Sequence, residues 1–209
     1  MVHRHLNRTV KHRASLLRNL VTNVLEHESI ITTHAKAKEA QTAVERLITK
    51  AIKAGPTPNN EKKQRLMNDI YKPQVILPKL LGEISTRYKS FTGGYTRVLK
   101  LENRVGDNAP QSILELVGGP RDMRMALTAR IVARLECQGA DLDPRTKLNV
   151  EKICRDDEST RRFKEEVEFM KNEFYTDEKL ESLPPLPKYE PKKKAPLELR
   201  PNPLNKKQA

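Results

Sequence analysis

The spacing of apolar residues predicts an amphipathic helix over residues 9–28, followed by a strand and a second helix. Apolar positions in the first helix recur every three or four residues, as one face of an α-helix requires: Val10, Ala14, Leu17, Val21 and Val24. Residues 29–32 are largely β-branched and too few for a helix, so they predict a strand. Thr33 is a suitable N-cap for a helix over residues 35–54, which Gly55 and Pro56 end.

Prolines divide the next part of the chain. A short polar helix is predicted over residues 61–71, and Pro73 ends it. Because proline does not fit the interior of a helix, the following helix is predicted to begin near Pro78. Its apolar residues include Leu80 and Ile84, and it leads the chain toward Arg87.

Two strands, residues 95–101 and 111–117, predict a β-hairpin. Both are rich in β-branched, aromatic and long aliphatic residues. Turn-forming residues precede, connect and follow them: Gly93-Gly94, Gly106-Asp107-Asn108 with Pro110, and Gly118-Gly119-Pro120. Polar and apolar residues alternate imperfectly in both strands, so the pattern does not show which face meets the core.

Helical patterns continue after the hairpin. Pro120 is predicted to open a helix that Gly139 ends, and Asp143-Pro144 provides a cap and first residue for another helix through residue 155. A third helix, over residues 156–175, carries one apolar stripe at helical spacing: Phe163, Val167, Met170 and Phe174. Such a stripe is typical of a core or docking face. With no neighbouring core evident in the sequence, we expect it to bind another protein.

These elements predict an α+β fold: a two-layer helix–strand–helices–β-hairpin domain with a small mixed sheet, an α-helical extension and an extended tail. The predicted boundaries are residues 1–118, 119–182 and 183–209. The tail has seven prolines and the cluster Lys192-Lys193-Lys194, a composition that cannot form a core. It is either a linker or a strap along RNA or a neighbouring subunit.

Charge indicates a polyanionic partner. The 209 residues include 40 Lys and Arg against 27 Asp and Glu, for a net charge of +13. Residues 1–120 hold 20 basic and 10 acidic residues, whereas residues 121–209 hold 20 and 17. The excess therefore lies mainly in the first part. The hairpin region contributes Arg87, Lys89, Arg97, Lys100 and Arg104, a density of cations that favours an RNA-binding surface over an enzyme core.

The first 25 residues contain no Asp or Glu. Their cations follow a largely helical pattern: Arg4, Arg8, Lys11, Arg13 and Arg18. This composition fits an amphipathic mitochondrial targeting segment as well as an RNA-binding arm, and a targeting role would leave the segment uncleaved. His3, His5 and His12 lie among these cations. No Cys or carboxylate pair stands near them at ligand spacing, so donation to phosphate is favoured over metal binding.

Several classes of protein are disfavoured. The sequence has no GxxxxGK[ST], GxSxG or HExxH motif and no paired cysteine ligands, so neither an enzyme nor a cofactor is expected. No apolar run is long enough to span a membrane. Cys137 and Cys154 suggest a reducing compartment without a disulfide framework.

Three stretches resemble a known family. They are LNRTVKHRASLLRNLVTNVLEHESIITTHAKAKEA near the N-terminus, the helix that runs into Arg87-Tyr88, and GGYTRVLKLENRVGDNAPQSILELV in the hairpin. All are similar, in the same order, to the ribosomal protein L17 family of the bacterial-type large subunit. The resemblance spans about residues 1 to 118. The sequence THAKAKEA, together with the long C-terminal extension, is most similar to fungal mitochondrial members.

The resemblance implies a structural protein of the large ribosomal subunit, located in the mitochondrial matrix. Its partners would be large-subunit rRNA and neighbouring ribosomal proteins near the exit tunnel, with no small-molecule substrate. Binding would rely on phosphate neutralisation and RNA shape. The matching stretches place contacts at Arg4, Arg8, Lys11, His12, Arg13, Arg18, Arg97, Lys100 and Arg104, and Arg87 and Lys89 stand just upstream of the hairpin.

Two alternatives remain open. A free RNA chaperone or RNA-processing accessory protein would be equally basic. A protein scaffold built around residues 121–175 would depend on Phe163 and Phe174 rather than on the N-terminal arginines.

Overall fold

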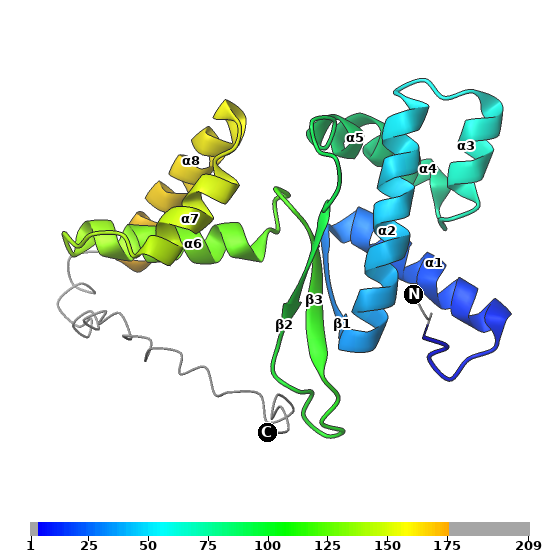
Figure 1. The fold of residues 1–209 in the computed structure, drawn as a ribbon, viewed down its shortest axis with the longest axis horizontal. Helices are drawn as coiled ribbons and strands as arrows, with labels where there is room; N and C mark the ends of the chain where they lie inside the picture. Colours follow the sequence, from blue (N-terminus) through cyan, green and yellow to red (C-terminus); the bar gives the residue numbers. More distant parts are fainter. Residues whose placement is uncertain (1–3, 176–209) are drawn as a thin grey trace, which may run out of the picture.

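The computed structural model of the chain describes residues 4–175 and has a three-stranded sheet at its centre (Figure 1). Helices α1 (Val10–His27) and α2 (His34–Ala54) flank strand β1 (Ser29–Thr33). They are followed by α3 (Asn60–Met67), α4 (Pro73–Lys79), the π-helix η1 (Leu80–Ile84), α5 (Ser85–Arg87), β2 (Thr96–Lys100) and β3 (Gln111–Leu116). Helices α6 (Met123–Cys137), α7 (Pro144–Ile153) and α8 (Asp157–Phe174) complete the described part. The predicted α+β class is confirmed, while the predicted tail lies outside the described residues.

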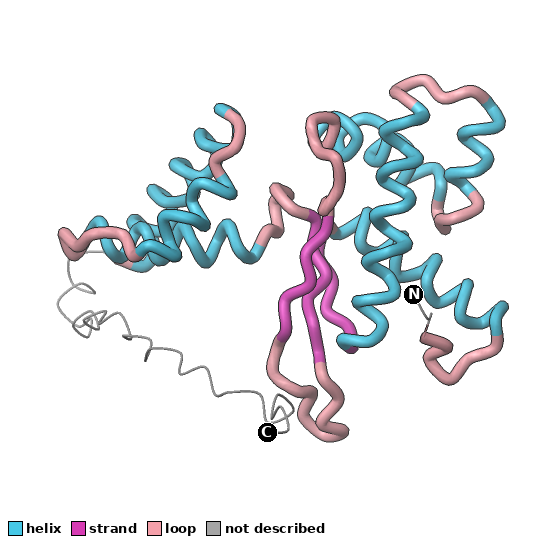
Figure 2. Tube along the Cα trace, in the orientation of Figure 1, coloured by secondary structure: helices cyan, strands magenta, loops and turns pink. Residues whose placement is uncertain are grey.

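Strand β3 lies between β1 and β2 and pairs antiparallel with both (strands in magenta in Figure 2). Leu114 is aligned with Ile30 on one side and with Val98 on the other. The sheet is therefore antiparallel throughout. The expectation of a mixed sheet is wrong in this detail, because β1 and β2 both run opposite to the central strand.

The two faces of β3 differ. Because successive side chains of a strand point to opposite faces, Leu114 and Leu116 lie together on the face that joins the main core under α1 and α2. Ile113 and Glu115 lie on the other face. There the end of the sheet is covered by the turn after β3, whereas Ile31 of β1 is 65% exposed. This arrangement assigns the faces that the imperfect alternation left open.

Two prolines act differently from the prediction. Pro73 is the first residue of α4 rather than the end of a preceding helix, and α3 already ends at Met67. Pro at this position costs little because its missing N–H would have no helical partner. Pro78 lies inside α4 and does not begin a helix. It cannot donate the backbone hydrogen bond to Gln74, and the chain continues directly as a π-helix at Leu80–Ile84.

The start of α6 also differs from the prediction. Pro120 was expected in the first turn of this helix, but α6 begins at Met123 with Asp122 as its N-cap. The Asp122 carboxylate accepts hydrogen bonds from the backbone amides of Arg124 and Met125, at 3.0 and 3.2 Å. Such a cap satisfies amides that the first helical turn cannot bond internally.

The extension has a small core of its own. Phe163 and Val167 of α8 are buried against Ala129, Val132 and Ala133 of α6. Met170 packs beside this cluster, and the Arg130 guanidinium lies 4.4 Å from the centre of the Phe174 ring. The apolar stripe of α8 was expected to bind another protein. That prediction is corrected, because α6 of the same chain covers the stripe.

Candidate nucleic-acid interface

The basic N-terminal arm is fixed to the start of the fold by Arg13. Its guanidinium donates to the backbone carbonyl of Arg4 at 2.7 Å and to the Glu39 carboxylate of α2 at 2.6 Å. The Arg4 amide also donates to Glu39, at 3.3 Å. Glu39 is only 11% exposed. Arg13 therefore holds the arm in place. The Arg4 side chain remains 54% exposed.

The first turns of α1 project beyond the core. Lys11 and His12 are exposed, and Val10, which the apolar pattern placed on the buried face, is 81% exposed. Arg8 donates to the Leu6 carbonyl at 2.7 Å, while its Nε finds no partner in the described part of the chain. Further along α1, the Arg18 guanidinium lies 5.1 Å from the centre of the Tyr71 ring. The arm thus presents cations to solvent from a rigid helix end.

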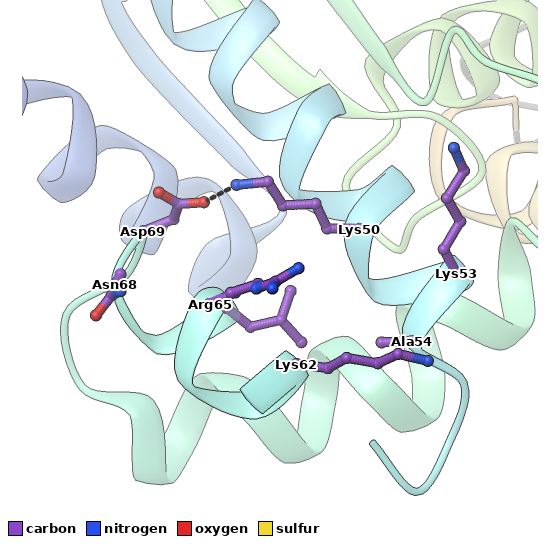
Figure 3. Close-up of a pocket in the computed structure, with 8 residues that line it drawn as sticks. Lys50, Lys53, Ala54, Lys62, Arg65, Asn68 and Asp69 are labelled. Atoms are coloured by element: carbon purple, nitrogen blue, oxygen red, sulfur yellow. Dashed lines mark hydrogen bonds and ion pairs between the residues drawn. The ribbon is translucent and has the colours of Figure 1, made fainter. Parts of the chain in front are cut away.

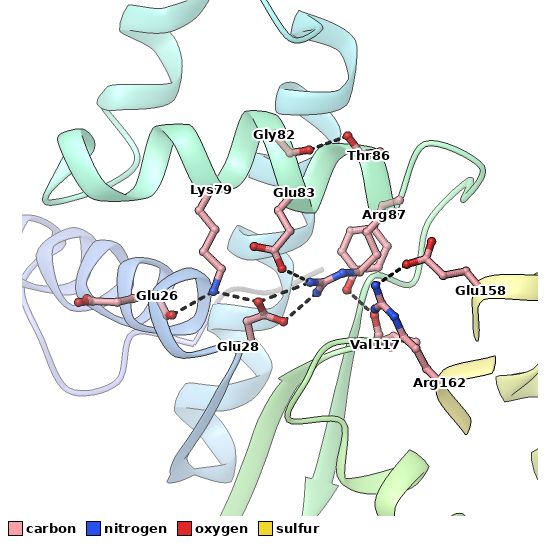
Figure 4. Close-up of polar contacts among 11 residues, drawn as sticks. Glu26, Glu28, Lys79, Gly82, Glu83, Thr86, Arg87, Val117, Glu158 and Arg162 are labelled. Carbon is pink, nitrogen blue, oxygen red and sulfur yellow. Dashed lines mark hydrogen bonds and ion pairs between the residues drawn. The ribbon is translucent and has the colours of Figure 1, made fainter. Parts of the chain in front are cut away.

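Arg87 belongs to a buried ion-pair network (Figure 4). It donates to Glu28 at 2.8 Å and to Glu83 at 2.6 Å, and Lys79 reaches Glu28 at 2.9 Å. Burial raises the pKa of Glu28, but the hydrogen bonds and charges of Arg87 and Lys79 outweigh it, so the pKa lies below its ordinary value. A Cβ at Gly119 would meet the Glu28 carboxylate at 2.3 Å, so a larger residue here would have to displace the carboxylate that Arg87 holds. Arg87 therefore joins α5 to the end of α1.

Arg97 forms a second network on the face of the sheet away from the main core. It donates to Glu115 at 2.7 Å and to Asp122 at 2.6 Å. The other Glu115 oxygen accepts from the Met123 amide at 2.9 Å. Burial raises the pKa of Glu115; the Met123 amide and Arg97 lower it only in part, and Asp122 raises it further. Arg97 thus joins the hairpin to the start of α6.

The remaining hairpin cations are exposed. Arg104 pairs with Asp107 at the hairpin tip, at 2.5 Å, and both side chains are 52% exposed. The hydrogen bonds from Arg104 and from the Ala109 amide lower the pKa of Asp107 to about 2. Lys89 and Lys100 are exposed. Within residues 4–175, neither lysine side chain forms an ion pair or hydrogen bond, so both are available to a ligand.

Comparison with known proteins decides the family. The family model for ribosomal protein L17 matches residues 16–117. A large ribosomal subunit protein bL17m from Neurospora crassa is 46% identical over 154 residues, which are 73% of this chain and 78% of that protein. The chain belongs to the ribosomal protein L17 family. The predicted resemblance is therefore confirmed.

Other members of the ribosomal protein L17 family match to different extents. A second fungal relative, bL17m from Schizosaccharomyces pombe, is 44% identical over 73% of both chains. The bacterial bL17 of Petrotoga mobilis is 47% identical over 115 residues, which are 54% of this chain and 90% of that protein. The fungal match thus extends over more of the chain than the bacterial one. Proteins of this family are structural components and not enzymes.

The ribosomal L17 fold offers no metal centre in its described part. Between residues 4 and 175, no three His, Cys, Asp or Glu side chains stand close enough to hold an ion. Cys137 and Cys154 are both free thiols. None of the helices in this range is long and apolar enough to cross a membrane.

Most of the predicted cations fall into two groups, and Arg4, Arg8 and Arg18 lie between them. Arg13, Arg87 and Arg97 bind carboxylates that are at most 11% exposed. Lys11, His12, Lys89, Lys100 and Arg104 are exposed. Sequence reasoning missed the buried acceptors Glu28 and Glu115. It also missed a cluster of lysines between α2 and α3, although Lys50 and Lys53 stand three residues apart on the polar face of α2.

Proposed function

We propose that this protein is a structural constituent of the large subunit of the mitochondrial ribosome and binds large-subunit rRNA. The observation that carries the proposal is the identity of 44 to 46% to fungal large-subunit proteins named bL17m, over 73% of the chain. The exposed cations of the arm and hairpin supply the charge that phosphate binding needs. Translation in the mitochondrial matrix is the process that this protein supports.

The contacts to rRNA come from two places, the helix end that carries Lys11 and His12 and the hairpin that carries Lys100 and Arg104. These cations sit on flexible side chains at the surface and suit phosphate oxygens rather than base edges. The extension follows the hairpin and reaches neighbouring large-subunit proteins near the exit tunnel. The proposed organisation is an rRNA-binding domain at residues 1–118, a helical extension at 119–182 and a tail at 183–209.

Sucrose-gradient sedimentation of mitochondrial lysate tests this function. Blotting should locate the chain with the large subunit, and magnesium chelation should shift it to subunit fragments as the rRNA unfolds. A membrane protein of the same lysate, solubilised in parallel, controls for trapping in aggregates. A peak at the top of the gradient under both conditions would contradict a ribosomal role. It would favour a free RNA-binding chaperone or processing protein.

A further inference from the structure

A pocket of about 440 Å³ lies between the C-terminal half of α2 and helix α3 (Figure 3). Its apolar floor includes Ala54 and Leu66. Four cations border it: Lys50, Lys53, Lys62 and Arg65. In Figure 3, Lys53 and Lys62 extend from the two helices on the side away from Asp69. The pocket therefore has a cationic rim on two separate helices.

Little of this charge is neutralised by other residues between 4 and 175. Lys50 pairs with Asp69 at 2.5 Å, but the two side chains are 51% and 42% exposed. The nearest carboxylate to Arg65 is that of Glu61, at 4.0 Å, in a pair that is 76% and 88% exposed. Across the described chain, Lys53 and Lys62 have no ion-pair partner. Exposed pairs of this kind contribute little to stability, so their cations can exchange partners.

The pocket continues into a second depression of about 290 Å³ between α1 and α2. The two share Lys50, Asn68 and Asp69, and the second is also lined by Arg13, Arg18 and Arg46. On α2, Arg46, Lys50 and Lys53 follow one another at spacings of four and three residues, so they lie on one face. At a rise of 1.5 Å per residue they span about 10 Å. A line of cations thus runs from α1 to α3.

We propose that this α2–α3 groove, bordered by Lys50, Lys53, Lys62 and Arg65, binds the sugar–phosphate backbone of an RNA segment. It is a second anchor, separate from the hairpin. Long cationic side chains around an apolar floor fit phosphates at the rim and the sugar below. RNA is favoured over an acidic protein because Arg46 and Arg18 continue the line of cations from the groove toward the basic arm. The inference rests on the proposed function and extends it to a new surface.

The test is the salt dependence of binding to in vitro transcribed large-subunit rRNA by the full-length protein. The variant is Lys53→Gln, Lys62→Gln and Arg65→Gln together. Each phosphate contact contributes about 0.7 to 0.9 to the slope of log affinity against log salt. The magnitude of the slope should therefore fall by about 2 to 3 in the triple variant. The single variant Lys53→Gln should lose less than about 1.

A matched control removes the same three charges from α7, as Arg145→Gln, Lys147→Gln and Lys152→Gln. Its slope should equal that of the wild type, and the unfolding midpoints of all variants should agree because the altered side chains are exposed. Failure of the wild-type protein to bind rRNA would overturn the proposed function itself. Wild-type binding with an unchanged slope in the triple variant would overturn only the groove. An unchanged slope combined with loss of the variant from the large subunit would assign the groove to an acidic protein instead.

Discussion

The junction between the sheet and its flanking helices differs sharply from the outer face of α2 and α3. At the junction, Arg87 and Arg97 are 14% and 19% exposed and contact Glu28 and Glu115, which are 3% and 0% exposed. On the outer face, Lys53 and Lys62 are exposed and form no ion pair within the described residues. Arginines at the junction connect elements of the fold. Lysines on the outer face of α2 and α3 remain available to bind a ligand.

The difference teaches that the number of cations in the sequence overstates the number available to a ligand. A buried carboxylate needs a cation, because removing it from water without a partner is costly. Each such carboxylate therefore neutralises one of the 40 Lys and Arg side chains inside the fold, which leaves the net charge of +13 unchanged but removes that cation from the binding surface. The cations left over are those with exposed or distant counter-ions, and they define where a polyanion can bind.

Replacing Arg97 with Ala should break the junction most severely. The change leaves Glu115 buried beside Asp122 without its cation, and we expect a loss of about 3 kcal/mol in the free energy of unfolding. Urea denaturation measures it, with Arg104→Ala as the control because that arginine pairs at the exposed hairpin tip. Equal stabilities of the two variants would show that Arg97 does not hold the hairpin to α6.

Replacing Glu28 with Gln should have a smaller effect that depends on pH. At neutral pH we expect a loss of about 2 kcal/mol, since hydrogen bonds to charged partners are weakened. The folded-state pKa of Glu28 is lowered, so its contribution is present above its ordinary pKa of 4.5 and is lost as pH falls through the folded value. The stability difference between wild type and variant should therefore shrink below pH 4.5. A difference that stays constant to lower pH would argue against the Arg87 and Lys79 pairing.

Replacing Lys100 with Gln should change stability least. The side chain is exposed and forms no ion pair in residues 4–175, so the free energy of unfolding should move by less than about 0.5 kcal/mol. Its affinity for large-subunit rRNA should fall, with a decrease of just under 1 in the salt slope. Filter binding at several salt concentrations measures the affinity and the salt slope, and urea denaturation measures the free energy of unfolding. A stability loss as large as that of Arg97→Ala would contradict the division into cations bound to buried carboxylates and exposed cations.

Much of the fold follows from local patterns. The helices at residues 10–27 and 34–54 and the two hairpin strands appear within a few residues of their predicted limits, because apolar spacing and turn residues are local signals. Pro73, Pro78 and Pro120 were misplaced. A proline fits the first turn of a helix, where its missing N–H would have no partner, but disturbs the helix interior. A shift of the helix start by a few residues therefore changes the effect of the same proline.

The sequence by itself determined the family, the α+β class and the concentration of positive charge in residues 1–120. It also indicated the exposed cations of the arm and hairpin as candidates for RNA binding. Only the tertiary structure decided which cations form ion pairs inside the fold. Arg97 pairs with Asp122, 25 positions away in the sequence, and Arg87 pairs with Glu28, 59 positions away. The tertiary structure likewise brought α6 against the stripe of α8, and Lys53 of α2 near Lys62 of α3. The physical reason is that ion pairing and burial depend on distances in space, which the packing of the whole chain sets.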